Sequence, residues 1–305
     1  MPRLYMGGGN RMKSISSAGA WILAARPKTL WAAFGPVLLG SALAHAHGGG
    51  HLPSAVVALL CAMLLQVATN FWNDYADHVR GADTADRVGP TRATQAGLIT
   101  AAAMRRAALA TFALAGLASL YLVLRGGWPM AVVGVLSILS GLAYTGGPRP
   151  LGYLGLGDLF VFVFFGPVAV AGTYFVQTLR WDPMVALAGC GPGALSVAIL
   201  VVNNLRDIAT DAPAGKRTLA VRFGPTFARL EYTACLLVAA LIPVLLWKLR
   251  WAPSNVALAG ASVLGGWRPL FRVWFEEGAA LNPGLAQTAL LLLFYSLIFS
   301  AGWLV

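Results

Sequence analysis

Long apolar stretches dominate the chain, and short polar segments separate them. Each stretch is close to the roughly 20 residues that a helix needs to cross a hydrocarbon core of about 30 Å. The pattern therefore predicts an all-α integral membrane protein with about nine transmembrane helices. The expected helices cover residues 28–47, 53–74, 99–123, 128–145, 157–178, 183–205, 230–249, 254–271 and 285–305.

One of these nine stretches, residues 254–271, is weaker than the others. Gly265, Gly266, Arg268 and Pro269 shorten its apolar run. Glycine and proline also interrupt regular helices, so the pattern loses its continuity there. A count of eight transmembrane helices therefore stays open.

The composition removes the alternative of a soluble domain. Hydrophobic residues make up 58% of the 305 residues, charged residues only 11%, and the mean hydropathy is +0.71. Soluble domains carry charges on about a quarter of their residues. We therefore expect the protein to be solvated largely by lipid.

The basic residues predict how the chain is oriented. With nine helices, all but four of the 22 Lys and Arg residues lie in the N-terminal segment or in loops on its side of the membrane. Basic loops stay in the cytoplasm, so we expect the N-terminus on the cytoplasmic side of the membrane. Anionic lipid headgroups then explain the net charge of +11 without a nucleic acid. The four exceptions are Arg125, Arg180, Lys248 and Arg250.

The first 20 residues differ from the rest of the chain. They are basic and interrupted by glycines, and they lack the apolar core and the small-residue cleavage site of a signal peptide. We interpret residues 1–20 as a flexible cytoplasmic tail. Residues 21–305 are expected to form a single transmembrane domain.

Acidic residues are concentrated in two short segments. The first begins at Asn70, near the end of the second expected helix, and the second begins at Asn203, near the end of the sixth. Four helices separate the two ends, so both segments are expected on the cytoplasmic side, where they can meet. Of the 11 acidic residues in the chain, these segments and their flanks hold Asp74, Asp77, Asp83, Asp86, Asp207 and Asp211.

Helical periodicity places the polar residues of each segment on one face. The spacing is i, i+3, i+4, i+7 in the first segment and i, i+4, i+8 in the second. Carboxylates at a helix C-terminus oppose the helix dipole, at a cost of roughly 0.3–1 kcal/mol each. A bound cation would compensate. The two stripes are Asn70, Asn73, Asp74 and Asp77, and Asn203, Asp207 and Asp211.

The residue types around these stripes favour Mg²⁺ and a phosphorylated ligand. Carboxylate and amide oxygens without cysteine suit a hard cation, and protein-bound Mg²⁺ often shares its site with substrate phosphates. Basic side chains next to such acids are what a diphosphate requires. The alternatives are an ordinary set of polar loop residues with local salt bridges, and an ion-coupled transporter. The neighbouring bases are Arg80, Arg87, Arg92, Arg206, Lys216 and Arg217.

Both segments resemble the Asp-rich motifs of the UbiA superfamily of intramembrane prenyltransferases. The first reads NFWNDYAD over residues 70–77, and the second reads NNLRDIATD over residues 203–211, with GKRTL following at 215–219. Further segments resemble the branch of the superfamily that prenylates 1,4-dihydroxy-2-naphthoate in menaquinone synthesis. They are residues 25–30, 86–90, 144–147 and 152–158.

The resemblance implies a bundle of nine helices around a central cavity that opens laterally to lipid, with Mg²⁺ holding a polyprenyl diphosphate. It implies catalytic roles for Asp74, Asp77, Asp207 and Asp211. The implied metal ligands are Asn70, Asp74, Asp77, Asp207, Asp211 and Asp83. The implied diphosphate contacts are Arg80, Lys216, Arg217, Asn73 and Asn203.

Two positions depart from the family pattern. Gly81 occupies the place where many members have a further Asp, so Asp83 is out of register as a ligand. Pro148 occupies the place where some members have a Lys, and whether Arg149 substitutes for it is open.

The resemblance also implies the reaction. A polyprenyl group would pass to 1,4-dihydroxy-2-naphthoate with loss of CO₂ and diphosphate, giving a demethylmenaquinol. Another aromatic acceptor, namely 4-hydroxybenzoate, haem or a chlorophyllide, is the alternative within the family. The candidates for binding the aromatic acid are Arg26, Lys28, Tyr144 and Arg149. Arg26 and Lys28 are equally consistent with interfacial anchors, and Tyr144 with an interfacial belt.

Overall fold

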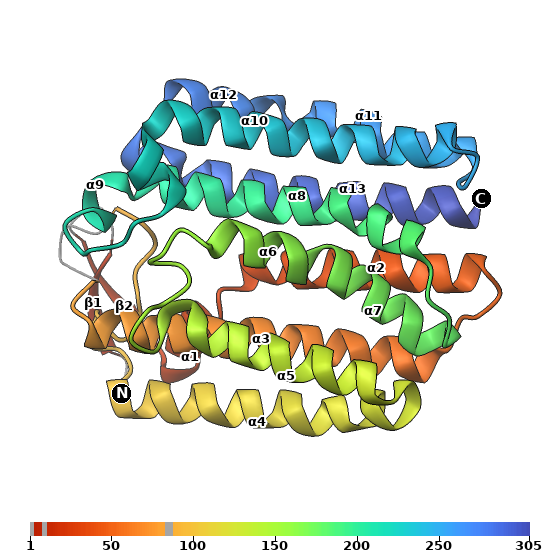
Figure 1. Ribbon diagram of the computed structural model, residues 1–305. Helices are drawn as coiled ribbons and strands as arrows, with labels where there is room; N and C mark the ends of the chain where they lie inside the picture. The colour runs from red at the N-terminus through yellow and green to blue at the C-terminus, as the bar shows by residue number, and fades with distance from the viewer. Residues whose placement is uncertain (1–2, 8–10, 83–87) are drawn as a thin grey trace.

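The protein is a bundle of helices that run side by side (Figure 1). The computed structural model describes residues 3–7, 11–82 and 88–305. The first half contains β1 (Arg3–Gly7), β2 (Arg11–Ile15), α1 (Ser17–Ala25), η1 (Pro27–Thr29), α2 (Leu30–Ala46), α3 (Leu52–Val79), α4 (Ala101–Gly126) and α5 (Trp128–Thr145). The middle contains α6 (Gly157–Phe165), α7 (Pro167–Thr178), α8 (Pro183–Arg206), α9 (Ile208–Asp211) and α10 (Leu219–Lys248). The last part contains η2 (Ser254–Val256), α11 (Ala257–Ser262), η3 (Val263–Gly266), α12 (Trp267–Phe275), η4 (Gly278–Leu281) and α13 (Asn282–Leu304).

The membrane-spanning pattern expected from the sequence is confirmed. Within the described residues, eight helical stretches are long and apolar enough to cross a membrane. The weak ninth stretch, 254–271, is a broken helix made of η2, α11, η3 and α12 beside α10. The start of α1 and the end of α13 lie toward opposite ends of the bundle (Figure 1).

Two breaks shape the helices around the interior. Arg26 has a left-handed φ of 52° and separates α1 from α2. Gly166 and Pro167 separate α6 from α7, because proline cannot donate the backbone hydrogen bond that would continue the helix. Gly166 also packs closely on α8. A Cβ atom there would lie only 2.7 Å from the carbonyl oxygen of Gly189.

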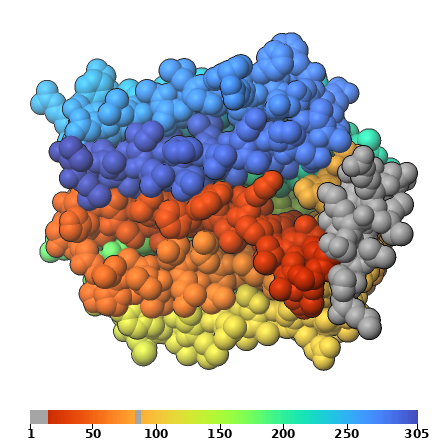
Figure 2. Space-filling model, turned by 180° about the vertical axis from the view of Figure 1, so that it is seen from behind, coloured from red at the N-terminus to blue at the C-terminus, as the bar shows by residue number. Residues whose placement is uncertain are grey.

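Helix α8 forms the centre of the packing. It is the most deeply buried of the membrane-spanning stretches and contacts α6, α7, α10 and α13. The side chains of Leu195, Tyr232 and Tyr295 are buried in the resulting core. A hydrogen bond of 2.9 Å between the hydroxyls of Tyr232 and Thr288 joins α10 to α13. On the opposite face, α13, α2, α3 and α4 follow one another (Figure 2).

The N-terminal segment contains the only strands in the described residues. β1 and β2 pair antiparallel, with Arg3 opposite Ile15 and Gly7 opposite Arg11. The all-helical architecture therefore holds for the transmembrane domain, and a short hairpin precedes it. The flexibility of residues 1–20 stays a prediction. Neither strand segment alternates cleanly between apolar and polar residues, so the sequence pattern gives no strand signal there.

Candidate active site

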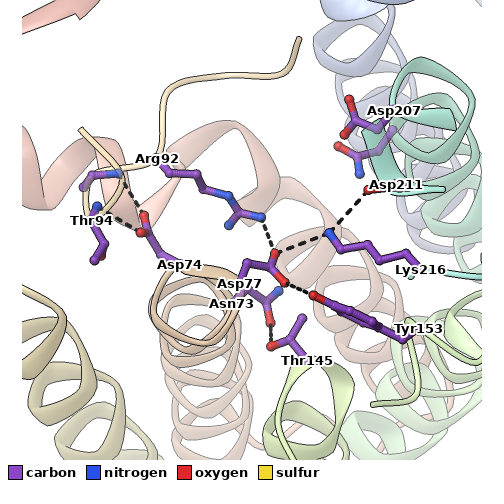
Figure 3. A network of polar contacts seen from close by, with 12 residues as sticks. Asn73, Asp74, Asp77, Arg92, Thr94, Thr145, Tyr153, Asp207, Asp211 and Lys216 are labelled. Carbon is purple, nitrogen blue, oxygen red and sulfur yellow. Dashed lines mark hydrogen bonds and ion pairs between the residues drawn. The ribbon is translucent and has the colours of Figure 1, made fainter. Parts of the chain in front are cut away.

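The two acidic segments meet, as their spacing along the chain predicts. The C-terminal ends of α3 and α8 lie at the same end of the bundle, which we call the acidic end (Figure 1). The ammonium group of Lys216 lies between them. Its Nζ is 3.6 Å from a carboxylate oxygen of Asp77 and 3.4 Å from one of Asp211. A single basic side chain thus connects the first segment to the second (Figure 3).

Asp77 is the most connected residue of the first segment. One carboxylate oxygen accepts a hydrogen bond of 2.9 Å from Arg92 and also faces Lys216. The other accepts a hydrogen bond of 3.0 Å from the hydroxyl of Tyr153. Asp77 and Arg92 are both buried, so their charges interact with little screening by water.

Asp74 instead holds the loop before α4. Its two carboxylate oxygens accept hydrogen bonds of 3.0 Å from the backbone N–H groups of Ala93 and Thr94 (Figure 3). The side chain is buried. Backbone donors therefore satisfy both oxygens of a residue that the sequence assigns to a metal.

The two asparagines of the first stripe point to other neighbours. Asn70 donates to the carbonyl of Ala25 at 2.9 Å and to the hydroxyl of Thr29 at 3.0 Å, which places the junction between α1 and α2 against α3. Asn73 accepts a hydrogen bond of 2.8 Å from Thr145 at the end of α5. The stripe predicted from periodicity exists, but its members contact five different segments of the chain.

The second segment largely neutralises itself. Arg206 donates two hydrogen bonds, of 2.7 and 2.6 Å, to the carboxylate of its neighbour Asp207. The same guanidinium donates to Asn203 at 2.7 Å and to Asn282 of α13 at 3.0 Å. The Arg206 side chain is fully buried. This pair therefore needs its mutual neutralisation to remain charged in the interior.

Asp211 remains available to the space between the segments. Burial raises the pKa of its carboxyl group, and the positive charge of Lys216 opposes that shift. The basic group beside Asp211 is Lys216, which also faces Asp77. The carboxylates of the two segments thus share the positive charge of Lys216, at a place where the sequence predicts a bound cation.

Tyr153 is a site residue whose role sequence reasoning missed. Arg80 and Lys216 lie over its ring, at 5.4 and 5.3 Å from the centroid, which are favourable cation–π distances. Burial and the nearby charge of Asp77 raise the pKa of its phenol, so it stays a hydrogen-bond donor. The only sequence signal was its place in the segment 152–158.

The other basic residues predicted for the site lie at its periphery. Arg80 is exposed and donates to the carbonyl of Gly147. Arg217 is exposed, and its backbone N–H donates to the carbonyl of Tyr153 at 2.9 Å. Lys28 and Arg149 are exposed as well, whereas Arg26 is partly buried at the break between α1 and α2. Asp83 lies outside the described residues.

An apolar cavity of about 310 Å³ begins beside this cluster. Asn70, Asn73 and Tyr144 line its end nearest the acids. From there it continues among α2, α3, α4, α5, α6 and α7, where the lining is mostly alanine, valine, leucine, phenylalanine and small residues. The bundle therefore places the polar, charged cluster at the mouth of the apolar cavity. The central cavity implied by the family resemblance is present.

The donor set suits a hard cation without forming a preassembled metal cage. Among the described residues, no three His, Cys, Asp or Glu side chains converge as a cluster that could hold a metal ion. Asp77 and Asp211 nevertheless face the ammonium group of Lys216 from two segments. Carboxylate oxygens of this kind are the ligands that Mg²⁺ prefers. The chemistry of these residues fits a divalent metal that arrives together with an anionic ligand.

Comparison with known proteins gives a consistent result. The model of the UbiA prenyltransferase family matches residues 33–298. The 1,4-dihydroxy-2-naphthoate octaprenyltransferase of Escherichia coli (strain K12) is 42% identical over 243 residues, which cover 78% of this chain and 79% of that protein. The protein of the same name from Mycobacterium tuberculosis is 41% identical, over 88% of this chain and 94% of its own length.

Solved structures share the fold. A UbiA homolog from Aeropyrum pernix K1 aligns with a TM-score of 0.67 at 15% identity, covering 90% of this chain and 96% of that one. A UbiA homolog from Archaeoglobus fulgidus bound to GPP and Mg²⁺ aligns with a TM-score of 0.61 at 16% identity, covering 92% and 99%.

Proposed function

Because this chain belongs to the UbiA prenyltransferase family, we propose that it transfers a polyprenyl group from polyprenyl diphosphate to 1,4-dihydroxy-2-naphthoate. CO₂ and diphosphate are lost, and a demethylmenaquinol is formed. The observation that carries this proposal is the identity of about two residues in five, over most of the chain, with proteins named for that reaction. The acidic cluster at the mouth of an apolar cavity supports a donor with a charged head and an apolar tail.

We assign Mg²⁺ binding to the two acidic segments. The residues that would hold the metal are Asn70, Asp74, Asp77, Asp207 and Asp211, with Asp83 outside the described part of the chain. Asp74 and Asp207 would first have to give up their hydrogen bonds to the Ala93–Thr94 backbone and to Arg206. When bound, Mg²⁺ supplies Lewis-acid stabilisation to the oxygens of the leaving diphosphate.

Basic and amide side chains complete the diphosphate site in this proposal. Negative charge grows on the diphosphate oxygens as the allylic carbon–oxygen bond breaks, so fixed positive charges at the site lower the barrier. Lys216 already lies between the two segments, and Arg80 lies over the same tyrosine ring. The proposed contacts are Arg80, Lys216, Arg217, Asn73 and Asn203.

The cavity protects the cation that bond breaking leaves on the allylic carbon. Its apolar lining excludes water, which would otherwise capture the carbocation. The electron-rich ring of the acceptor attacks instead, at the carbon that bears the carboxylate, and CO₂ leaves as aromaticity returns. Tyr144 lines the end of the cavity nearest the acids, which supports it as a candidate contact for that ring. Arg26, Lys28 and Arg149 are the candidates for the acceptor carboxylate.

The orientation in the membrane is part of the same proposal. The acidic end carries most of the basic loops, so the positive-inside rule places it in the cytoplasm of a bacterial cell, at the inner membrane. Water-soluble acceptor and Mg²⁺ would then reach the site from the cytoplasm, and the prenyl donor from the lipid.

The test is a product mass. Purified protein is incubated with Mg²⁺, a polyprenyl diphosphate and either 1,4-dihydroxy-2-naphthoate or 4-hydroxybenzoate. We expect a product only with the naphthoate, at a mass that shows the loss of CO₂. Prenylation of 4-hydroxybenzoate with none of the naphthoate would reject the assigned acceptor while keeping the family reaction.

A further inference from the structure

Among the described residues that line the cavity, three carry an amide side chain, and all three lie on α3. They are Gln66, Asn70 and Asn73. The oxygen of Asn73 accepts a hydrogen bond from Thr145, and Asn70 lines the end nearest the acids. Gln66 is four residues, about 6 Å, farther from the acidic end than Asn70. An amide this deep in an apolar interior needs a hydrogen-bonding role, because an unpaired buried amide costs free energy.

One hydroxyl group holds the amide of Gln66. Its side-chain nitrogen donates a hydrogen bond of 3.1 Å to the Oγ1 of Thr29, and Asn70 donates to the same oxygen at 3.0 Å. The Thr29 hydroxyl in turn donates to the carbonyl of Arg26 at 2.9 Å. Its proton and both of its lone pairs are thus used. Only the N–H end of the Gln66 amide can therefore face Thr29.

The carbonyl oxygen of Gln66 is left for another partner. The amide group is planar, so its oxygen points away from the nitrogen that Thr29 holds. No described residue donates a hydrogen bond to this oxygen, and it is not sealed inside the protein. The side chain is only partly buried, and it lines the cavity. An open hydrogen-bond acceptor thus faces a ligand that enters the cavity.

The opposite wall of the cavity places Tyr144 close to this level. Helix α5 approaches α3 at Gly141, where a Cβ atom would lie 2.8 Å from the hydroxyl oxygen of Thr69. Both helices run toward the acidic end, so Tyr144 lies three residues nearer to that end than this contact, and Gln66 lies three residues farther. The two side chains are therefore separated by about 9 Å along the bundle. A naphthalene ring system with its substituents spans a distance of this size.

The proposed acceptor supplies the missing donor. In 1,4-dihydroxy-2-naphthoate, the 1-hydroxyl is next to the carboxylate and donates to it within the molecule. The 4-hydroxyl has no such partner, and burying it without one costs free energy. When the carboxylate faces the basic candidates at the acidic end, the 4-hydroxyl lies on the far side of the ring. It is then deeper in the cavity, at the level of Gln66.

We propose that the carbonyl oxygen of Gln66 accepts a hydrogen bond from the 4-hydroxyl of the acceptor, and that Thr29 is the positioning residue that turns this oxygen toward the cavity. The inference rests on the proposed function and extends it to acceptor specificity. A site that hydrogen-bonds a substrate hydroxyl rejects an analogue without it, because the protein group is then left unpaired. Gln66 thus selects acceptors that carry a hydroxyl at this position.

The experiment compares two acceptors. 1-Hydroxy-2-naphthoate lacks only the 4-hydroxyl and keeps the 1-hydroxyl, which is adjacent to the attacked carbon and activates it. With saturating polyprenyl diphosphate, kcat/KM is measured for each acceptor from the prenylated product. The unsubstituted protein should prefer the dihydroxy acceptor by at least about tenfold, the size of one hydrogen bond to a substrate hydroxyl. The intrinsic reactivity of each acceptor is the same for every variant, so a change in this preference reports the protein contact.

Gln66→Met removes the amide and keeps a long, unbranched side chain. We expect kcat/KM with the dihydroxy acceptor to fall by about tenfold, and kcat/KM with 1-hydroxy-2-naphthoate to stay within about threefold. Thr29→Val should lower the preference by at least about threefold, because Gln66 is no longer oriented, and Thr29→Ser should restore it. Thr111→Val is the matched control and should leave the preference unchanged, since the Thr111 hydroxyl donates to Ala107 in its own helix at 2.8 Å.

The outcomes separate this inference from the proposed function. Equal losses with both acceptors in Gln66→Met would overturn it, because Gln66 would then only hold α3 against the start of α2. An unchanged preference in that variant, or no preference in the unsubstituted protein, would overturn it as well. If Gln66→Met does not insert into the membrane, Thr29→Val and Thr29→Ser test the same preference with Gln66 in place. Conversion of neither naphthoate by the unsubstituted protein counts against the proposed function instead.

Discussion

The two acidic segments look alike in sequence but are used differently in the fold. The first segment, Asn70–Asp77 on α3, directs its polar side chains to five other parts of the chain. In the second segment, Asn203–Asp211, most side-chain hydrogen bonds are donated by its own Arg206. They go to Asp207 and to Asn282 of α13. The first segment therefore positions the parts of the site, whereas the charges of the second are balanced within the segment itself. Lys216 links the two segments. Similar motifs can thus divide the tasks of positioning and charge balance.

The largest effect expected is from metal removal. If both segments hold Mg²⁺, chelation with EDTA should lower prenyl transfer by more than about 10³-fold, since Lewis-acid stabilisation of the leaving group is lost. Added Mg²⁺ should restore the rate, and added Na⁺ at equal ionic strength should not. Activity that survives complete chelation would mean that the segments neutralise charge without a metal.

Arg206→Met should lower the free energy of unfolding by about 3–5 kcal/mol, because it leaves the buried carboxylate of Asp207 in the second segment without its partner. Thermal unfolding in detergent measures the loss. Arg229→Met is the control, since Arg229 pairs with the exposed Glu277 and should change stability by at most about 1 kcal/mol. Equal stability of the two variants would contradict the self-neutralised character of the second segment.

Asp77→Asn should lower kcat by about 10²–10³-fold, as loss of a preorganised electrostatic contact does elsewhere, because Asp77 contacts Arg92, Tyr153 and Lys216 together. Asp182→Asn is the matched control. Asp182 caps α8 at the far end of the bundle, and asparagine caps a helix about as well as aspartate. Comparable activity of both variants would remove Asp77 from the centre of the site.

Tyr153→Phe should have the smallest effect. It removes one hydrogen bond to the Asp77 carboxylate, worth about 1.5 kcal/mol, and keeps the ring beneath Arg80 and Lys216. We expect a loss of about tenfold in kcat/KM, measured with the same donor and acceptor. A loss as large as that of Asp77→Asn would show that the phenol contacts substrate directly rather than positioning the carboxylate.

The fold could largely be predicted because lipid imposes a simple rule. A helix must be apolar over about 20 residues to cross the membrane, and the observed α5 matches the expected range 128–145 at both ends. The stretch 254–271 was the hardest to assign, because Gly265 and Gly266 interrupt it, and it is the stretch that the structure breaks into short pieces. The hairpin near the N-terminus had no periodic signal.

The site could be predicted only in part. Counting helices was enough to place Asp77 and Asp211 at the same end of the bundle. The partners were not readable from the sequence, because Tyr153, Thr145 and Asn282 contact site residues through tertiary packing rather than through spacing along a helix. Their partners are Asp77, Asn73 and Arg206, respectively. Nor does periodicity reveal that backbone N–H groups occupy both oxygens of Asp74. The role of Asp83 remains a prediction outside the described residues.

The buried apolar cluster at the end of the cavity far from the acids also matters to the membrane as an electrical insulator. A protein that holds a large void in the bilayer, with a charged mouth at one face, could short-circuit the voltage across it. Here the void is blind: Val37, Leu122 and Met130 close it, and Arg125 and Gln177 fasten the helices behind them. Within the described residues, this cavity therefore offers ions drawn to the acidic end no continuous polar path to the other side.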